Sequence, residues 1–88
     1  MIRTHHLKIL AEYFDSIACG DKTFEIRKND RGFQKGDIVY LHEIKSGFGD
    51  FETGRSIIAQ LGYVTNFEQK DGYCVFSLLD VVIVGGEV

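Results

Sequence analysis

The clearest hydrophobic pattern in the 88-residue chain lies near its start and is typical of an amphipathic helix. Apolar residues recur there at spacings of three and four, which places them on one helical face: Leu10, Tyr13, Phe14, Ile17 and Ala18. Gly20 follows the last of them and can adopt the left-handed conformation that ends a helix. We therefore expect a helix over residues 10–18 that buries Leu10, Tyr13, Phe14 and Ile17.

The rest of the pattern is typical of strands. Residues 2–9 read as extended, and so do residues 22–28, where Phe24 and Ile26 alternate with Glu25 and Arg27. We expect the two apolar side chains to be buried and the two charged ones to share the opposite face. Three more extended runs, separated by polar or glycine-rich loops at residues 29–36, 45–54 and 66–72, are expected at residues 38–43, 56–65 and 73–84.

Both long runs, 56–65 and 73–84, carry apolar residues on both faces for part of their length. In a flat sheet with one solvent-exposed face, apolar and polar residues would alternate more strictly along each strand. A small closed barrel instead buries residues on both faces and leaves no open edge. The pattern therefore predicts a mainly β, α+β fold: a barrel of five to six strands with a helix after the first strand. With 44% hydrophobic and 26% charged residues, the composition fits a single globular domain over residues 1–88.

Several classes of protein are not expected. No apolar stretch approaches the roughly 18–20 residues that span a bilayer, and no apolar segment typical of a signal peptide is visible at the N-terminus. Two cysteines, Cys19 and Cys74, suit a reducing compartment, so we expect a cytoplasmic protein. No phosphate-binding glycine loop, cofactor or metal is expected, because the spacing of four candidate ligands matches no standard metal site: His5, His6, His42 and Glu43.

The charge is unevenly distributed along the chain. The formal net charge of −3 argues against a generic polyanion binder, because nonspecific nucleic-acid binding depends on neutralising phosphates. Residues 22–35 nevertheless hold five basic residues against two acidic ones, a local charge of +3, so the remainder carries −6. A basic segment on an acidic body favours a small, specific anionic ligand over a long duplex.

The candidate chemistry lies in residues 20–31. Glu25 and Arg27 can pair on one strand face, or present a donor fork beside an acceptor, and Lys22 stands at the strand entrance. Fixed donors and acceptors beside a cleft suit a nucleobase edge, which offers both. The alternative interpretation is a surface ladder of salt bridges, which would contribute little stability.

The run Gly20-x-Lys22-x-x-Glu25-x-Arg27 resembles the signature of ASCH domains, in the PUA-like superfamily. Its extension through Lys28-Asn29-Asp30-Arg31 resembles a narrower branch of small bacterial and phage proteins of unknown function. Other positions match that branch as well: His5-His6-Leu7-Lys8, Phe33, Gly36-Asp37, Glu43 and Thr53-Gly54-Arg55. The resemblance covers essentially the whole chain.

This resemblance implies a small β-barrel with a helix after the first strand and a cleft lined by the signature residues. By analogy with PUA domains it implies binding of RNA or a nucleotide. We expect Lys22, Arg27 and Arg31 to contact phosphate or base acceptors, Glu25 and Asn29 to hold or read donors, and Arg55 to complete an anion-binding wall with Arg27. Phe33 or Tyr40 is a candidate stacking surface.

Two alternative functions stay open. Some ASCH-like proteins are amidohydrolases that deacetylate acetylcytidine, and the chain resembles them at Gly20-x-Lys22-Thr23 and at Arg27. Their catalytic threonine, however, falls where this chain has Glu25, and the helical insertion that bears their catalytic glutamate has no counterpart here. In such an enzyme Lys22 would be the base, with Thr23 or Glu25 assisting. The other alternative is a protein-interaction module of a phage; the oligomeric state is left open.

Overall fold

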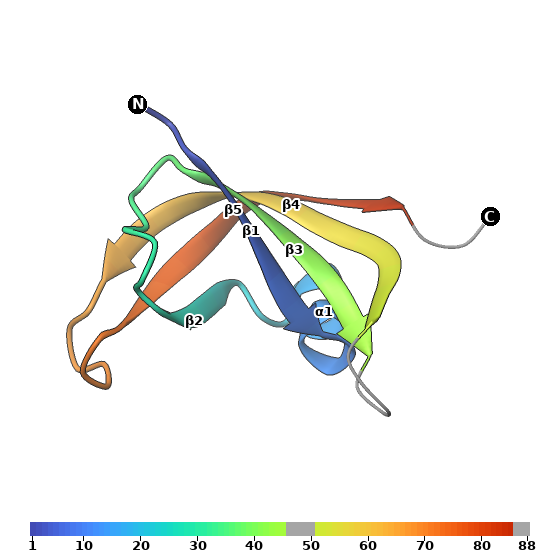
Figure 1. Cartoon of the computed structure of the whole chain (residues 1–88), viewed down its shortest axis with the longest axis horizontal. Coiled ribbons are helices and arrows are strands. Elements are labelled where there is room, and N and C mark those ends of the chain that lie inside the picture. Colours follow the sequence, from blue (N-terminus) through green and yellow to red (C-terminus); the bar gives the residue numbers. More distant parts are fainter. Residues whose placement is uncertain (46–50, 86–88) are drawn as a thin grey trace.

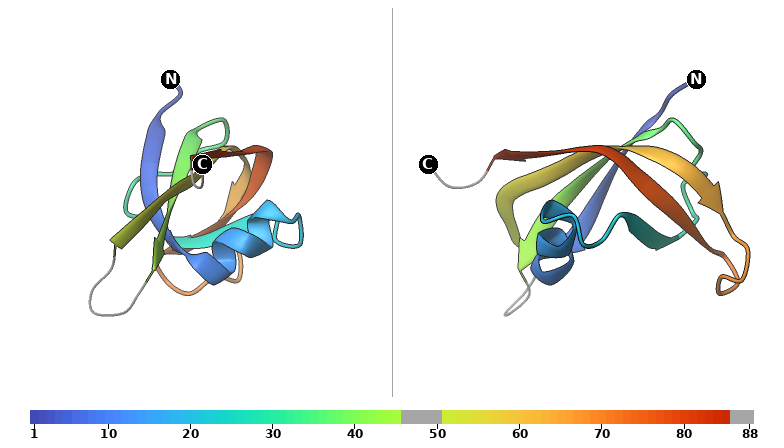
Figure 2. Two further views of the ribbon diagram at one scale, coloured as in Figure 1. Left: turned by 90° about the vertical axis from the view of Figure 1, so that its right-hand side faces the viewer. Right: turned by 180° about the vertical axis from the view of Figure 1, so that it is seen from behind.

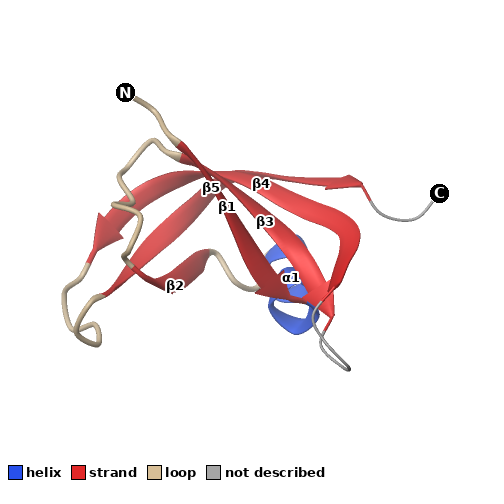
Figure 3. Cartoon of the chain, in the orientation of Figure 1, coloured by secondary structure: helices blue, strands red, loops and turns tan. Residues whose placement is uncertain are grey.

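The computed structural model describes residues 1–45 and 51–85 and is mainly β (Figures 1 and 3). Five strands and one short helix follow one another along the chain: β1 (Thr4–Leu10), α1 (Ala11–Ala18), β2 (Phe24–Lys28), β3 (Ile38–Lys45), β4 (Phe51–Thr65) and β5 (Tyr73–Gly85). The predicted fold class, with a helix directly after the first strand, is confirmed. In the ranges that the structure describes, no helix is long and apolar enough to cross a membrane.

The five strands form one curled sheet in the order β1-β3-β4-β5-β2 (Figure 2). β1 runs parallel to β3, and the other three pairs are antiparallel. The curl is that of a half-barrel rather than the closed barrel we expected, because β1 and β2 are its two edge strands and are not paired with each other in the sheet. The opening between these edges is where the candidate site lies.

The core fills the concave side of the sheet, and α1 contributes Phe14 and Ile17 to it. The expected burial of Tyr13 and Leu10 is wrong: Tyr13 is half exposed, and Leu10 is the last residue of β1, before the helix begins. An eight-residue helix against the edge of a half-barrel turns only a narrow stripe inward. The prediction of the core partners of this helix is also wrong, because none of Phe24, Ile38 and Ile58 belongs to the buried cluster. The helix packs instead with a cluster of other side chains: Leu7, Ile9, Phe33, Val39, Leu41, Ile57, Ala59, Leu61, Cys74, Phe76 and Leu78.

The orientation of β2 is the reverse of the one expected. Phe24 and Ile26 are 42% and 52% exposed, whereas Glu25 is only 4% exposed. The register explains the reversal, because Glu25 lies opposite the buried Phe76 of β5 and directly opposed residues share a face. Glu25 and Arg27 do share one face, as expected, but it is the concave one.

A buried pair fixes the loop between β2 and β3 against the start of β1. Asp37 accepts hydrogen bonds from His5 Nε2 at 2.9 Å and from the backbone N–H groups of Arg3 and Gln34 at 3.2 and 3.1 Å. Burial alone raises the pKa of Asp37, but these three hydrogen bonds outweigh it, and the pKa lies below its ordinary value. The pair thereby holds β1 and the start of β3 in place beside the site.

Candidate functional site

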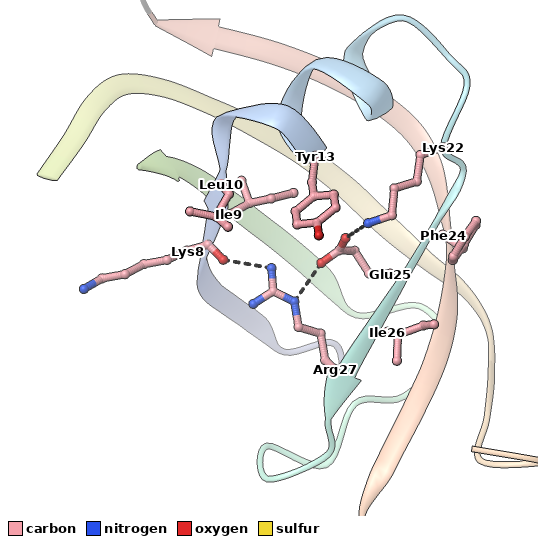
Figure 4. Close-up of a pocket in the computed structure, with 9 residues that line it drawn as sticks. All are labelled: Lys8, Ile9, Leu10, Tyr13, Lys22, Phe24, Glu25, Ile26 and Arg27. Atoms are coloured by element: carbon pink, nitrogen blue, oxygen red, sulfur yellow. Dashed lines mark hydrogen bonds and ion pairs between the residues drawn. The ribbon is translucent and has the colours of Figure 1, made fainter. Parts of the chain in front are cut away.

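A pocket of about 480 Å³ opens where β1, α1 and β2 meet (Figure 4). β1 provides one wall, Tyr13 projects from the helix, and β2 provides the other wall. Its lining is Lys8, Ile9, Leu10, Tyr13, Lys22, Phe24, Glu25, Ile26 and Arg27. Three members of the signature seen in the sequence therefore lie in one concavity: Lys22, Glu25 and Arg27.

These three residues form one ionic cluster. Both oxygens of Glu25 are occupied, Oε1 by Lys22 Nζ and Oε2 by Arg27 Nε at 2.7 Å. Arg27 also donates from Nη2 to the backbone carbonyl of Lys8, at 2.8 Å. Figure 4 shows this guanidinium reaching from β2 across the opening to β1. Arg27 thus links the two edges of the sheet that the strand pairing leaves apart.

The rim of the pocket is aromatic and apolar. Lys22 Nζ lies 5.0 Å from the centre of the Tyr13 ring and 5.5 Å from that of Phe24, within the range of cation–π attraction. Both rings are nevertheless substantially exposed, as are Leu10 and Ile26 beside them. The pocket thus combines two cations, paired with one buried carboxylate, and two exposed aromatic rings.

A smaller pocket of about 200 Å³ adjoins the first one at Arg27, which lines both. The other residues of this smaller pocket are Leu7, Lys28, Asp30, Arg31 and Phe33. Arg31 is therefore a neighbour of the cluster, and among the residues described its guanidinium has only a loose 4.0 Å pair to Asp30. Asn29 lines neither pocket; its Oδ1 accepts a hydrogen bond from the N–H of Phe33 at 3.0 Å and organises the loop.

Arg55 is not brought together with Arg27. It donates to Glu43 from Nε at 2.9 Å and from Nη2 at 2.7 Å, contacts Asp15 at 3.3 Å, and lies 4.4 Å over the ring of Phe14. These hydrogen bonds hold the pKa of the buried Glu43 below its ordinary value and raise that of Arg55. The expected anion-binding wall is absent from the pocket, because Arg55 lines neither cavity and instead fastens α1 to β3 and β4.

The other candidates lie outside the main pocket. Thr23 is exposed, and its carbonyl accepts a hydrogen bond from the N–H of Leu78. Phe33 is buried against His5 and Phe76, and Tyr40 stacks on His6 at the outer face of the sheet. In the described ranges, no three His, Cys, Asp or Glu side chains gather as metal ligands would.

Sequence reasoning missed the two aromatic residues that do line the pocket, Tyr13 and Phe24. Their apolar spacing assigned both to the core. A signal for Phe24 was its place two residues after Lys22, because a lysine ammonium is attracted to an aromatic ring face.

Comparison with known proteins identifies a family and a relative of this chain. The profile of the family described as "Domain of unknown function (DUF3850)" matches residues 4–78, which include every residue of the main pocket. A relative in Escherichia phage P2, "Uncharacterized 12.9 kDa protein in GpA 3'region", is 39% identical over 66 residues. The match covers 75% of this chain and 58% of that protein, so the chain spans little more than half of its relative's length. The chain belongs to the DUF3850 family.

Proposed function

We propose that the chain is a small ASCH/PUA-like binding domain that recognises RNA or a nucleotide-like anionic ligand. The observation that carries the proposal is the cluster of Lys22 and Arg27 on a buried carboxylate, inside a pocket with two exposed aromatic rings. All three charged members of the ASCH-like signature lie in this pocket. That gathering also supports the ASCH assignment, which otherwise rests on the sequence motif.

The two cations have distinct roles in this proposal. Glu25 holds both in place, so that they are ordered before a ligand arrives and lose little entropy on binding. In the part of the chain described, no hydrogen bond uses Nη1 of Arg27, which is therefore a candidate donor to a phosphate or a base oxygen. Arg31, in the adjoining pocket, would contact a further phosphate.

Tyr13 and Phe24 would provide the stacking surface, in place of Phe33 and Tyr40. Each ring that stacks on a base would contribute about 1–3 kcal/mol. The basic segment at residues 22–35 supplies the electrostatic attraction. Because Cys19 and Cys74 are both free thiols, we also infer a cytoplasmic location.

The geometry favours binding over the amidohydrolase alternative. Lys22 is engaged by Glu25 and flanked by two rings, and Thr23 lines neither pocket. Incubation with acetylcytidine separates the two functions: we expect no cytidine to form. Turnover that is lost in Lys22→Ala would replace the binding proposal with the enzymatic one.

The direct test is a titration of fluorescent RNA oligomers and nucleotides at low and moderate salt. We expect saturable binding that weakens as salt rises, because part of it is electrostatic. Arg27→Ala should reduce the affinity, whereas Lys70→Ala, which removes the same charge from a loop away from the pocket, should not. Absence of saturable binding to every probe would overturn the proposal, and a discrete protein partner in a pull-down would then favour the interaction module.

A further inference from the structure

The outer face of the sheet holds a hydrogen-bonded chain of three side chains from three neighbouring strands. Ser56 Oγ on β4 lies 2.7 Å from Nδ1 of His42 on β3, and Nε2 of His42 lies 2.9 Å from Nδ1 of His6 on β1. Ser56 and His42 are directly opposed in the ladder, and His6 is opposite Tyr40, two residues before His42. Each residue is at least partly exposed.

The two imidazoles meet edge to edge. Their planes differ by only 3°, the ring centres are 5.1 Å apart, and the facing nitrogens are 2.9 Å apart. Rings stacked face to face would keep their nitrogens at van der Waals distance, so a separation this short requires the nitrogens to point at each other. One shared hydrogen therefore lies between His6 and His42.

The protons can be placed consistently along the whole chain. In one of the two proton orders that these distances allow, the hydroxyl of Ser56 donates to Nδ1 of His42, and Nε2–H of His42 donates to Nδ1 of His6. This order is a nucleophile, a base and a group that orients the base, the arrangement by which enzymes activate a serine. A β-bulge follows His42 immediately, and bulges are over-represented next to active sites.

The neighbours of Ser56 on this face are apolar on one side and basic on the other. The ladder places Lys8, His42, Ser56 and Val84 in one row across the sheet, and His6, Tyr40, Ile58 and Val82 in the next. Val82 is 54% exposed, and Val84 beside it is also exposed. These valines form an exposed apolar surface beside Ser56.

We propose that Ser56, His42 and His6 form a second site, separate from the pocket, that takes carboxylic esters with an apolar acyl group. Oγ of Ser56 attacks the ester carbonyl carbon and its proton passes to Nδ1 of His42. The bond to the alcohol oxygen breaks, the alcohol leaves with the proton from His42, and an acyl-Ser56 ester remains. A water molecule, deprotonated by His42, then releases the carboxylic acid and restores the hydroxyl. His6 is a positioning residue, because it acts only through His42.

The test uses p-nitrophenyl butyrate with the full chain, following nitrophenol release and locating the butyryl group by mass spectrometry. We expect one butyryl group on Ser56. Ser56→Ala should lower the acylation rate at least about 100-fold, and His42→Ala should do so by about 10²-fold or more, the usual contribution of a general base. Ser16→Ala, which removes a hydroxyl from α1, should leave the rate unchanged.

Two further variants separate chemistry from folding. Ser56→Cys keeps a nucleophile at the same position and should still be labelled there, even where Ser56→Ala is unstable. For His6, glutamine offers a carbonyl that can accept the hydrogen bond from His42 and should restore the rate that His6→Leu loses. A butyryl group found only on lysine amines, or an equal rate in Ser56→Ala, would overturn the proposal without affecting the nucleotide pocket.

Discussion

Truncation of Phe14 to alanine tests whether α1 is an integral part of the core. The side chain is fully buried and belongs to the main apolar cluster, and the guanidinium of Arg55 lies over its ring. Removing a buried phenylalanine costs about 3–5 kcal/mol, from lost burial and from the cavity left behind. Since domains of this length have total stabilities of about 4–13 kcal/mol, the variant should be close to unfolding.

The assay is urea unfolding followed by circular dichroism, with Tyr13→Ala as the matched control on the same helix. Tyr13 is half exposed, so its loss should cost no more than about 1 kcal/mol. In thermal melts each kcal/mol should lower the midpoint by about 4–8 °C for a domain of this size. Equal effects of the two substitutions, or a cost below about 1 kcal/mol for Phe14→Ala, would refute the packing described here.

Three further predictions concern acid stability, thiol reactivity and the pocket. Because the pKa of Asp37 is lowered in the folded state, its ionised carboxylate contributes to the free energy of unfolding at every pH above the ordinary carboxyl pKa. That contribution is lost as the pH falls through the pKa of the folded state. Asp37→Asn should therefore reduce the dependence of the urea midpoint on pH in the acid range, and an unchanged dependence would contradict this. Burial raises the pKa of Cys74, so iodoacetamide should alkylate the exposed Cys19 first. Equal alkylation rates at the two thiols, measured by mass spectrometry, would refute this prediction. In the RNA titration, Glu25→Lys should abolish binding by crowding like charges, whereas Glu25→Gln should weaken it with an unchanged dichroism spectrum; undiminished binding by Glu25→Lys would contradict the role given to Glu25.

The secondary structure was largely predictable because it follows from local periodicity. The helix over residues 10–18 is found as Ala11–Ala18, and the strand expected at residues 73–84 is found as Tyr73–Gly85. The start of β4 differs, because residue 51 was placed in the loop 45–54 but begins the strand. Residues 46–50 of that loop lie outside the described residues.

The face of β2 was mispredicted because hydrophobicity alone was used to decide it. Phe24 and Ile26 would be buried on an isolated strand pattern, yet the strand is an edge beside a pocket and presents them at the rim. Glu25 can point inward because Lys22 and Arg27 satisfy both of its oxygens, which offsets the cost of removing a carboxylate from water. The alternation indicated that Glu25 and Arg27 could pair, but the face on which they pair is set by how β2 lies against β5.

Contacts between strands were beyond sequence reasoning for a related reason. Arg55 carries the same charge as the pocket cations, so its sequence context does not show where it lies. The packing of α1 against β3 and β4 places it beside Glu43 and away from Arg27. The hydrogen-bonded chain of Ser56, His42 and His6 depends on the register of three strands. A one-residue slip of any of these strands would turn its side chain to the other face of the sheet and break the chain of hydrogen bonds.

The most direct test of the central claim is nuclear magnetic resonance of the ¹⁵N-labelled chain during addition of a short single-stranded RNA or a nucleoside monophosphate. Binding in the pocket predicts saturable shifts of the backbone amides of residues 8–10, 13 and 22–27, with shifts also at Arg31 when a second phosphate is present. The same titration of Arg27→Ala should show much smaller shifts. Saturable shifts confined to residues away from the pocket, or none with any of these ligands, would contradict the account.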